Sequence, residues 1–339
     1  MKTALITGVT GQDGSYLSEL LLSQGYEVHG LLRRVSSYEI RNIEQIRDKI
    51  TLHWGDLENE HHLCSIINDL KPDEIYNLAS QSDVRVSFDI PEYTGDVTGL
   101  GFLRILEAVR KFSPHSRVYQ ASSSEMYGDS RPPQNEDTGF NPQNPYAAAK
   151  LYAFHMGRIY RKAYGMFVAN GILFNHESPR RGLNFVTRKI TNAAAKIKLG
   201  KEKGLQLGNI NAQRDWGYAP EYVRAMWLML QHDEPDDYVI ATGETHSVRQ
   251  FVEAAFDRIG IDLQWSGKGV EEKGIDARTG RPIVTIASQF FRPTEVDLLA
   301  GDYSKAKREL GWSPETTFKG LVEIMVDYDL RLVENERHR

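Results

Sequence analysis

Short apolar runs alternate along the first half of the chain with longer segments in which apolar residues recur every three or four positions. The short runs predict buried strands at 3–7, 27–32, 50–54, 74–79 and 117–122. The longer segments predict helices near 14–24, 60–70, 95–112 and 145–164. Because strands that alternate with helices favour a parallel sheet covered on both faces, the pattern predicts an α/β, doubly wound fold.

This alternation loosens beyond about residue 175. Further strands are predicted at 166–174 and 237–242, and further helices at 185–199 and 221–231. We therefore predict a doubly wound, parallel-sheet domain over 1–175, with a returning segment near 215–245. Residues 176–214 and 246–339 are predicted to form a smaller, discontinuous C-terminal domain that binds the substrate.

Composition narrows the class of protein. The chain has 339 residues, 40% of them apolar, which is enough for one large domain or two smaller ones. Its net charge of −5 disfavours nucleic-acid binding. The single cysteine, Cys64, excludes an intrachain disulfide and fits a reducing compartment. The chain shows neither a signal-peptide pattern nor a membrane-length apolar run, so we expect a cytoplasmic protein with no membrane partner.

The first predicted strand leads into a glycine-rich loop that contains Gly8, Gly11 and Gly14. In this G-x-x-G-x-x-G spacing, the first glycine permits a tight turn and the next permits the backbone to approach a pyrophosphate. The helix that follows offers N–H groups and a favourable dipole to the phosphates. Because the loop stands at the first strand of an alternating sheet, we interpret it as the dinucleotide site of a Rossmann domain. The alternative is a turn that uses its glycines only for packing.

The end of the second predicted strand indicates which dinucleotide binds. An NAD site usually has an acidic residue there for the ribose hydroxyls, whereas this chain has Arg33 and Arg34. Two guanidinium groups suit a 2′-phosphate, so the sequence favours NADP, unless the pair belongs to a solvated basic loop. After the third strand, Asp56 and Leu57 are predicted to contact the cofactor, with Asp56 at the adenine side.

Tyr146 and Lys150 are spaced i and i+4 on a predicted helix, so both lie on one face. Beside a nicotinamide, the lysine charge would lower the pKa of the tyrosine and let its phenolate take a proton from an alcohol. The same spacing also occurs by chance on an ordinary helix face. The stretch "VYQASSSEMYG" adds a hydroxyl-rich strand end, with Ser123 followed by the carboxylate of Glu125.

The three glycines, Ser123, Tyr146 and Lys150 together resemble the extended short-chain dehydrogenase/reductases that act on nucleotide sugars. The resemblance implies that the Ser123 hydroxyl hydrogen-bonds the sugar O4. Epimerases of this family carry a small neutral residue at the position of Glu125, whereas its 4,6-dehydratases carry Glu. The resemblance therefore implies that Glu125 is the base that removes the C5 proton.

Motifs along nearly the whole chain are similar to the GDP-mannose 4,6-dehydratases within this family. The matching blocks are "NGILFNHESPRRG", "FVTRKI", "RDWG", "VIATG", "SVRQFVE", "GVEEKG" and "FFRPTEVD". The residues that this resemblance implies for GDP-sugar binding are Asn175, Lys189, Arg214, Arg292 and Glu295. The chain departs from the family pattern at Ser123, usually Thr, at Asp83, usually His, and at Arg85, usually a small residue.

The resemblance implies an NADP-dependent 4,6-dehydratase that converts GDP-mannose to GDP-4-keto-6-deoxymannose. Asp83 and Arg85 leave open a related sugar such as GDP-manno-heptose. A reductase or epimerase on the same scaffold, or a nucleotide-binding regulatory protein without turnover, are further alternatives. The family also implies a homo-tetramer, with the segment 33–45 reaching a neighbouring subunit. The sequence has no metal-ligand spacing, so we expect no metal site.

Overall fold

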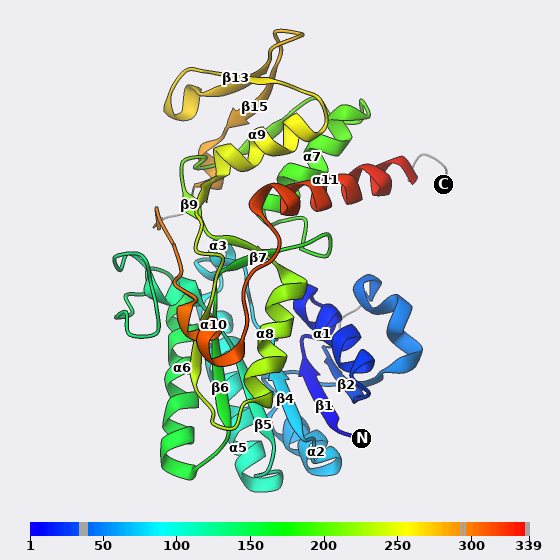
Figure 1. Cartoon of the computed structure of the whole chain (residues 1–339), viewed down its shortest axis with the longest axis vertical. Helices are drawn as coiled ribbons and strands as arrows, with labels where there is room; N and C mark the ends of the chain where they lie inside the picture. The colour runs from blue at the N-terminus through cyan, green and yellow to red at the C-terminus, as the bar shows by residue number, and fades with distance from the viewer. Residues whose placement is uncertain (34–39, 292–293, 295, 336–339) are drawn as a thin grey trace.

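The computed structural model describes residues 1–33, 40–291, 294 and 296–335. Its lower part is built on a seven-stranded sheet in which all neighbouring strands are parallel (Figure 1). The strands follow the order β11 (Asp237–Ile240), β6 (Val168–Leu173), β5 (Arg117–Ser123), β4 (Glu74–Asn77), β1 (Thr3–Thr7), β2 (Glu27–Leu32) and β3 (Thr51–Trp54). The strand order reverses next to β1, which is the switch point where open α/β sheets bind ligands. The predicted α/β, doubly wound fold is confirmed.

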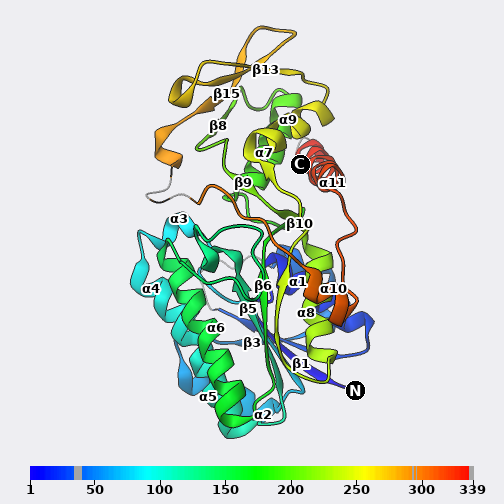
Figure 2. The same cartoon turned by 60° about the vertical axis from the view of Figure 1, so that its left-hand side comes forward.

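Helices cover both faces of this sheet (Figure 2). On one face lie α1 (Gln12–Ser23), the 3₁₀ helix η1 (Arg41–Lys49) and α8 (Ala219–Gln231). On the other lie α2 (Glu60–Leu70), α5 (Gly101–Phe112) and α6 (Pro145–Tyr164). In α5, Phe102, Ile105, Leu106 and Val109 recur at helical spacing and are all buried, so this helix is held by its apolar stripe. A turn of π-helix, η2 (Asp96–Leu100), joins it to α4 (Pro91–Gly95).

A second region stands above the carboxyl ends of the large sheet (Figure 1). Its four-stranded sheet consists of β13 (Leu263–Ser266), β14 (Lys273–Asp276), β15 (Pro282–Ile286) and β8 (Leu205–Leu207). The helices that share a buried core with this sheet are α7 (Val186–Lys198), α9 (Val248–Arg258) and α11 (Phe318–Asn335). Two short pairs complete the fold: β7 (Asn175–Glu177) with β10 (Trp216–Tyr218), and β9 (Gln213–Arg214) with β12 (His246–Ser247). Among the described helices, none has the length and apolar character needed to span a membrane.

The sequence predicts the large sheet better than the small one. Strands 3–7 and 27–32 and helices 60–70 and 145–164 begin and end where the sequence places them. The small sheet was not predicted, because residues along β13 are alternately exposed and half-buried and leave no continuous apolar run. The domain division stays a prediction. Within the segment assigned to the second domain, α10 (Ser304–Leu310) packs against β11 and α8.

Buried polar side chains link three strands of the large sheet. Thr7 Oγ1 donates to Asn77 Oδ1 at 2.7 Å, and Asn77 Nδ2 donates to Gln120 Oε1 at 2.7 Å. Gln120 Nε2 in turn donates to the carbonyl of Ala121 at 3.1 Å, and Thr7 Oγ1 accepts from the backbone N–H of Ala79 at 3.1 Å. Because each of these side chains has partners, β1, β4 and β5 carry the polar groups at low cost and stay in register.

The second region contains a buried ion pair between α7 and α11. Arg188 Nη2 lies 2.6 Å from Asp329 Oδ1, and both side chains are almost fully buried. Thr191 Oγ1 donates to Asp329 at 2.6 Å, while Arg188 Nη1 donates to the carbonyls of Pro179 and Arg181. The pair therefore holds the loop after β7 as well as joining the two helices.

We expect Asp329→Ala to lower the free energy of unfolding by about 3–5 kcal/mol, because it leaves the Arg188 charge buried without its carboxylate. Asp327→Ala, two residues earlier on the same helix, is the matched control. It breaks a pair with Arg258 in which both side chains are more than a third exposed, so its loss should be much smaller. Urea unfolding of both variants measures the difference, and equal losses would contradict the role of the buried pair.

Candidate active site

A cavity of about 960 Å³ is lined by residues at the carboxyl ends of the large sheet and by residues of the second region. This volume suits a bound small molecule or cofactor. The predicted residues that line it are Gly8, Gly11, Gly14, Arg33, Asp56, Leu57, Ser123, Glu125, Tyr146, Lys150, Asn175, Lys189 and Arg214. The other predicted residues, Arg34, Arg292 and Glu295, lie outside the described residues.

The glycine loop forms a cradle that side chains would fill. Gly8 has φ +70°, and a Cβ there would lie 2.9 Å from the backbone nitrogen of Ala79. A Cβ on Gly14 would lie 2.3 Å from the carbonyl oxygen of Gly8. Gly11 is the N-cap of α1 and has no side chain to satisfy the first N–H groups of the helix. Ser122 Oγ is buried in the cavity wall without a hydrogen-bond partner among the described residues. These features fit a dinucleotide with its phosphates at the start of α1.

The ends of β2 and β3 supply the next part of the cavity wall. Arg33 directly follows β2, is exposed, and donates from Nη1 to the hydroxyl of Tyr93. Asp56 and Leu57 follow β3, and Leu57 is held by Arg104, which donates to its carbonyl at 3.0 Å. The Arg33 guanidinium and the Asp56 carboxylate therefore lie on the same side of the cavity. A dinucleotide with its phosphates at the glycine loop would have its adenosine half on this side.

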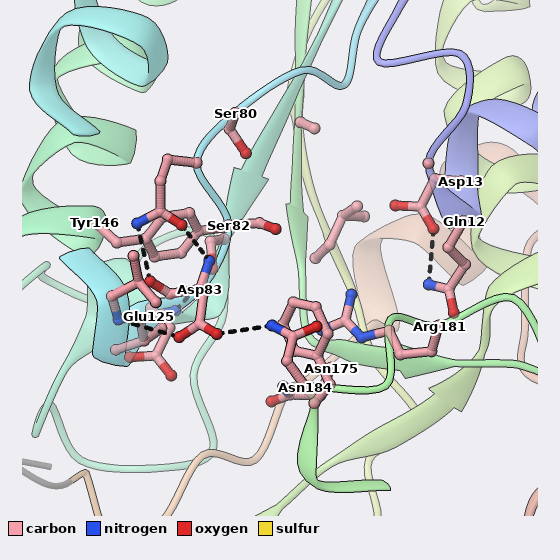
Figure 3. Close-up of a pocket in the computed structure, with 18 of the residues that line it drawn as sticks. Gln12, Asp13, Ser80, Ser82, Asp83, Glu125, Tyr146, Asn175, Arg181 and Asn184 are labelled. Carbon is pink, nitrogen blue, oxygen red and sulfur yellow. Dashed lines mark hydrogen bonds between the residues drawn. The ribbon is translucent and has the colours of Figure 1, made fainter. Parts of the chain in front are cut away.

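Ser123 and Glu125 lie where β5 ends and the short helix η3 (Ser124–Tyr127) begins. The backbone N–H of Glu125 donates to Ser123 Oγ at 3.2 Å, which caps this turn. Glu125 is only 6% exposed, and its Oε2 accepts from Asn144 Nδ2 at 3.0 Å. Glu125 is therefore a buried carboxylate in a cavity wall and not a charge on a surface loop (Figure 3).

Tyr146 and Lys150 face the same cavity from α6. Lys150 Nζ lies 5.7 Å from the centre of the Tyr146 ring and donates to the carbonyl of Ala121 at 2.7 Å. Burial raises the pKa of Tyr146 to about 12, against a hydrogen bond from Ser123 that acts to lower it. This direction is opposite to the one expected from the lysine charge, because the loss of solvation outweighs the favourable contacts. Burial also lowers the pKa of Lys150 to about 8.

An ion pair joins α1 to β7 on the opposite wall of the cavity. His176 Nε2 lies 2.8 Å from Asp13 Oδ2, and the His176 carbonyl accepts from Gln12 Nε2 at 3.1 Å. Gln12 Oε1 also accepts from the Ser178 hydroxyl at 2.8 Å. Burial opposes both charges, yet the mutual attraction lowers the pKa of Asp13 and raises that of His176. The helix of the glycine loop is thus fixed to the segment that leads into the second region.

The residues predicted for GDP-sugar binding line the other end of the cavity. Asn175 begins β7, and Lys189 on α7 places Nζ 3.4 Å from the centre of the Phe290 ring. Burial lowers the pKa of Lys189. Arg214 is 6% exposed and donates from Nη1 to the carbonyl of Gln213 at 2.9 Å. The structure brings these three together with the catalytic candidates in one cavity.

Asp83 and Arg85, the departures from the family pattern, both have protein partners. Asp83 caps α3 (Val84–Ser87), since its Oδ1 accepts from the backbone N–H groups of Arg85 and Val86 at 2.9 and 3.2 Å. Its Oδ2 accepts from Asn184 Nδ2 at 2.8 Å, across the cavity mouth (Figure 3). Arg85 Nη1 pairs with Asp89 at 2.9 Å. Asp83 therefore stabilises a helix start and a contact between the two regions.

Sequence reasoning missed several polar residues of the site. Asp13 lies in the first turn of α1, where the helix dipole favours an acid, and Asn144 is the N-cap of α6, so neither position gave a functional signal. Arg181 lines the cavity, with Nε 3.2 Å from Glu177 Oε2. It lies, with His176, in the block "LFNHESPRRG", which was the available signal for both.

A family model described as GDP-mannose 4,6 dehydratase matches residues 5–325. The chain belongs to the GDP-mannose 4,6-dehydratase family. The GDP-mannose 4,6-dehydratase of Sinorhizobium fredii (strain HH103) is 55% identical, and 99% of each chain is covered. The GDP-mannose 4,6 dehydratase of Homo sapiens is 54% identical, with 97% of this chain and 92% of that protein covered. The resemblance to this family read from the sequence motifs is confirmed.

The fold of this GDP-mannose 4,6-dehydratase family member is also similar to more distant solved structures. One is dTDP-glucose 4,6-dehydratase from Bacillus anthracis str. Ames, solved in complex with NAD. The TM-score is 0.81 at 21% identity, and 99% of this chain and 98% of that chain are covered. At this identity the likeness supports the fold and not the chemistry.

We expect Lys150→Met to stabilise the nucleotide-free protein at pH 7 by roughly 1–2 kcal/mol. The pKa shift from 10.5 to about 8 corresponds to about 3 kcal/mol against the buried ammonium, and loss of its hydrogen bond offsets part of that. Between pH 8 and about 10.5 the unfolded chain binds the proton more tightly, so the wild type gains stability as pH rises. The advantage of the variant should therefore shrink above pH 8.

Urea unfolding at several pH values measures this difference. Lys162→Met, on the exposed part of the same helix, is the matched control and should show no comparable pH dependence. An advantage of Lys150→Met that stays constant from pH 7 to pH 10 would show that the ammonium is not penalised by burial.

Proposed function

We propose that the protein is a GDP-mannose 4,6-dehydratase, a lyase that converts GDP-mannose to GDP-4-keto-6-deoxymannose with loss of one water. The observation that carries this proposal is the buried Glu125 carboxylate, which lines the same cavity as Ser123 and Tyr146. A tyrosine and a nicotinamide are enough to oxidise an alcohol, whereas elimination of water also needs a base for a carbon-bound proton. We assign that step to Glu125, because its carboxylate stands two residues beyond Ser123 in the cavity wall.

The first half of the reaction depends on Tyr146. As phenolate, Tyr146 removes the proton from O4 and becomes a neutral hydroxyl, and Ser123 hydrogen-bonds the same oxygen. Because burial raises the pKa of Tyr146 to about 12, its phenolate needs stabilisation, and both the Ser123 hydrogen bond and the Arg181 charge act in that direction. The glycine loop and Lys150 would hold a nicotinamide cofactor, which would supply the hydride acceptor for C4 and the hydride donor for C6.

The second half depends on Glu125. The ketone at C4 acidifies the C5–H bond, and Glu125 takes that proton. Ser124, the neighbouring residue, offers no acid, so we assign to Glu125 the return of the proton to O6, which leaves as water. Tyr146 then gives the proton it took from O4 to C5. Each residue ends in its starting state, and the sugar loses only one water.

We propose NADP as the cofactor. Arg33 supports this choice, because its guanidinium stands on the cavity wall after β2, where the 2′ position of the adenosine ribose is recognised in such folds. Arg34 is proposed to share this role. The proposed substrate residues Asn175, Lys189 and Arg214 bring an amide and two cations to the other end of the cavity, which suits a nucleoside diphosphate.

The alternatives have less support. A reductase or epimerase does not need a carboxylate at C5, whereas this chain has Glu125 buried in the cavity wall and hydrogen-bonded to Asn144. The heptose alternative rested on Asp83 and Arg85, which both have protein partners. A homo-tetramer in the cytoplasm is proposed from the resemblance alone, and light scattering at micromolar concentration measures the assembly.

We expect Glu125→Gln to slow dehydration of GDP-mannose by about 10²–10⁴-fold, the usual effect of removing a general base. Oxidation at C4 should continue, so the absorbance of reduced nicotinamide should form and persist. Exchange of the C5 hydrogen with deuterated solvent should fall in parallel with the loss of water, both followed by mass spectrometry.

Tyr146→Phe is the contrasting variant, because it blocks the proton transfer from O4 and should give no reduced nicotinamide. Full dehydration by the Gln variant would remove Glu125 from the mechanism. The same early block in both variants would show that Glu125 acts before elimination.

We expect replacement of Arg33 and Arg34 by Ala to weaken NADP binding far more than NAD binding, because only NADP carries the 2′-phosphate. Titration of the purified protein with each dinucleotide measures both affinities. Arg47→Ala, an exposed arginine on η1 outside the cavity wall, is the control and should change neither affinity. An equal loss for the two cofactors would contradict the choice of NADP.

A further inference from the structure

Asn144 connects two parts of the site that come from different elements. Its backbone is the N-cap of α6, the helix that carries Tyr146 and Lys150, and its side chain contacts Glu125 at the end of β5. Asn144 is 7% exposed and stands outside the cavity lining formed by Glu125, Tyr146 and Lys150. The Asn144 side chain therefore contacts the Glu125 carboxylate from the protein side and not from the cavity.

The orientation of the Asn144 amide is determined by the helix that it caps. Asn144 Oδ1 accepts from the backbone N–H of Ala147 at 2.8 Å, and this position requires an acceptor. Because an amide side chain has one acceptor end and one donor end, Nδ2 must face Glu125 Oε2, 3.0 Å away. The cap thus dictates that Glu125 meets an N–H donor.

The amide also has little freedom to move. Pro145 fixes the first helical position, and the N–H of Ala148 donates to the Asn144 carbonyl at 3.1 Å. The backbone carbonyl and the side-chain oxygen of Asn144 are both hydrogen-bonded to the first turn of α6. The Asn144 amide therefore stays in place and fixes the position of the Glu125 carboxylate. The spacing between Glu125 and Tyr146, two residues beyond Asn144, is fixed by the same contact.

We propose that Asn144 is a positioning residue for the elimination step. Its N–H holds the Glu125 carboxylate in the orientation that takes the C5 proton. The proposal rests on the proposed function, because it presupposes that Glu125 is the C5 base. It predicts that elimination depends on Asn144 while oxidation at C4 does not.

Substitutions at Asn144 can separate the cap from the contact with Glu125. Asn144→Ser and Asn144→Asp both keep an oxygen that caps α6, and both lose the N–H donor. Asn144→Asp also places a second carboxylate beside Glu125, which favours the protonated form of the pair. Asn144→Ala removes the cap and the donor together and serves as the structural control.

We expect exchange of the C5 hydrogen to fall roughly 10-fold in Asn144→Ser, the effect of one lost hydrogen bond of about 1.4 kcal/mol. In Asn144→Asp the fall should be larger at neutral pH, and the acid limb of the pH–rate profile should move up by about one unit or more. Formation of reduced nicotinamide should stay close to wild type in both. The melting temperature should stay close to wild type in Asn144→Ser, which keeps the cap, and should fall clearly in Asn144→Ala, which lacks it.

Other charged and titratable groups share the cavity with Glu125 and are unchanged in these variants: Asp13, Arg33, Asp56, Asp83, Arg85, Tyr93, Tyr146, Lys150, His176, Glu177, Arg181, Lys189 and Arg214. Figure 3 shows Asp13, Asp83, Tyr146 and Arg181 among them. A shift of the acid limb of the pH–rate profile in Asn144→Asp is therefore caused by the carboxylate introduced at position 144. Wild-type exchange and an unmoved pH profile in both Asn144→Ser and Asn144→Asp would overturn the proposal, since Asn144 would then be a cap only. Glu125→Gln distinguishes this failure from that of the proposed function: if it dehydrates GDP-mannose normally, Glu125 is not the base, and if it is blocked, the error lies with Asn144 alone.

Discussion

The hydrogen bond from Lys150 Nζ to the carbonyl of Ala121 holds the proposed active site together. It ties α6 to β5, so the helix that carries Tyr146 and the strand that ends in Ser123 cannot shift relative to each other. The contact requires that the Lys150 side chain be buried, and burial disfavours the charged form of its amine. The packing of α6 against β5 and β6 offsets that cost, and the proposed catalysis would use this buried amine.

Burial also decides which groups can do chemistry in the cavity. Tyr146 is made a weaker acid by its surroundings, so it gives up its proton only when a hydrogen bond and a cation favour the phenolate. Glu125 is buried beside it, yet it meets an N–H donor that suits a carboxylate. The two residues thus have different hydrogen-bond partners in one cavity, which fits the two proton transfers proposed to occur in sequence on one sugar.

The sequence predicted the large sheet because each of its strands is an apolar run between helices of clear periodicity. It also predicted Gly8, Gly14 and the Tyr146–Lys150 pair, since their spacing has a direct physical meaning. It could not predict the ion pair between Asp13 and His176, because these two residues are 163 positions apart in the sequence and come into contact only after folding. Nor could it reveal the contact between Asn144 and Glu125, because an asparagine before a helix is sufficiently explained as a cap.

The polar chain through Thr7, Asn77 and Gln120 has a consequence for how the protein reaches its fold. Apolar strands of similar length can slide past one another and still bury their side chains. Here a slip of one residue would turn Asn77 to the opposite face of the sheet and leave its neighbours on β1 and β5 without partners in a dry interior. The three side chains therefore favour a single register of β1, β4 and β5 over shifted ones. Because residues that follow these strands line the cavity, a shifted register would also displace the cavity wall.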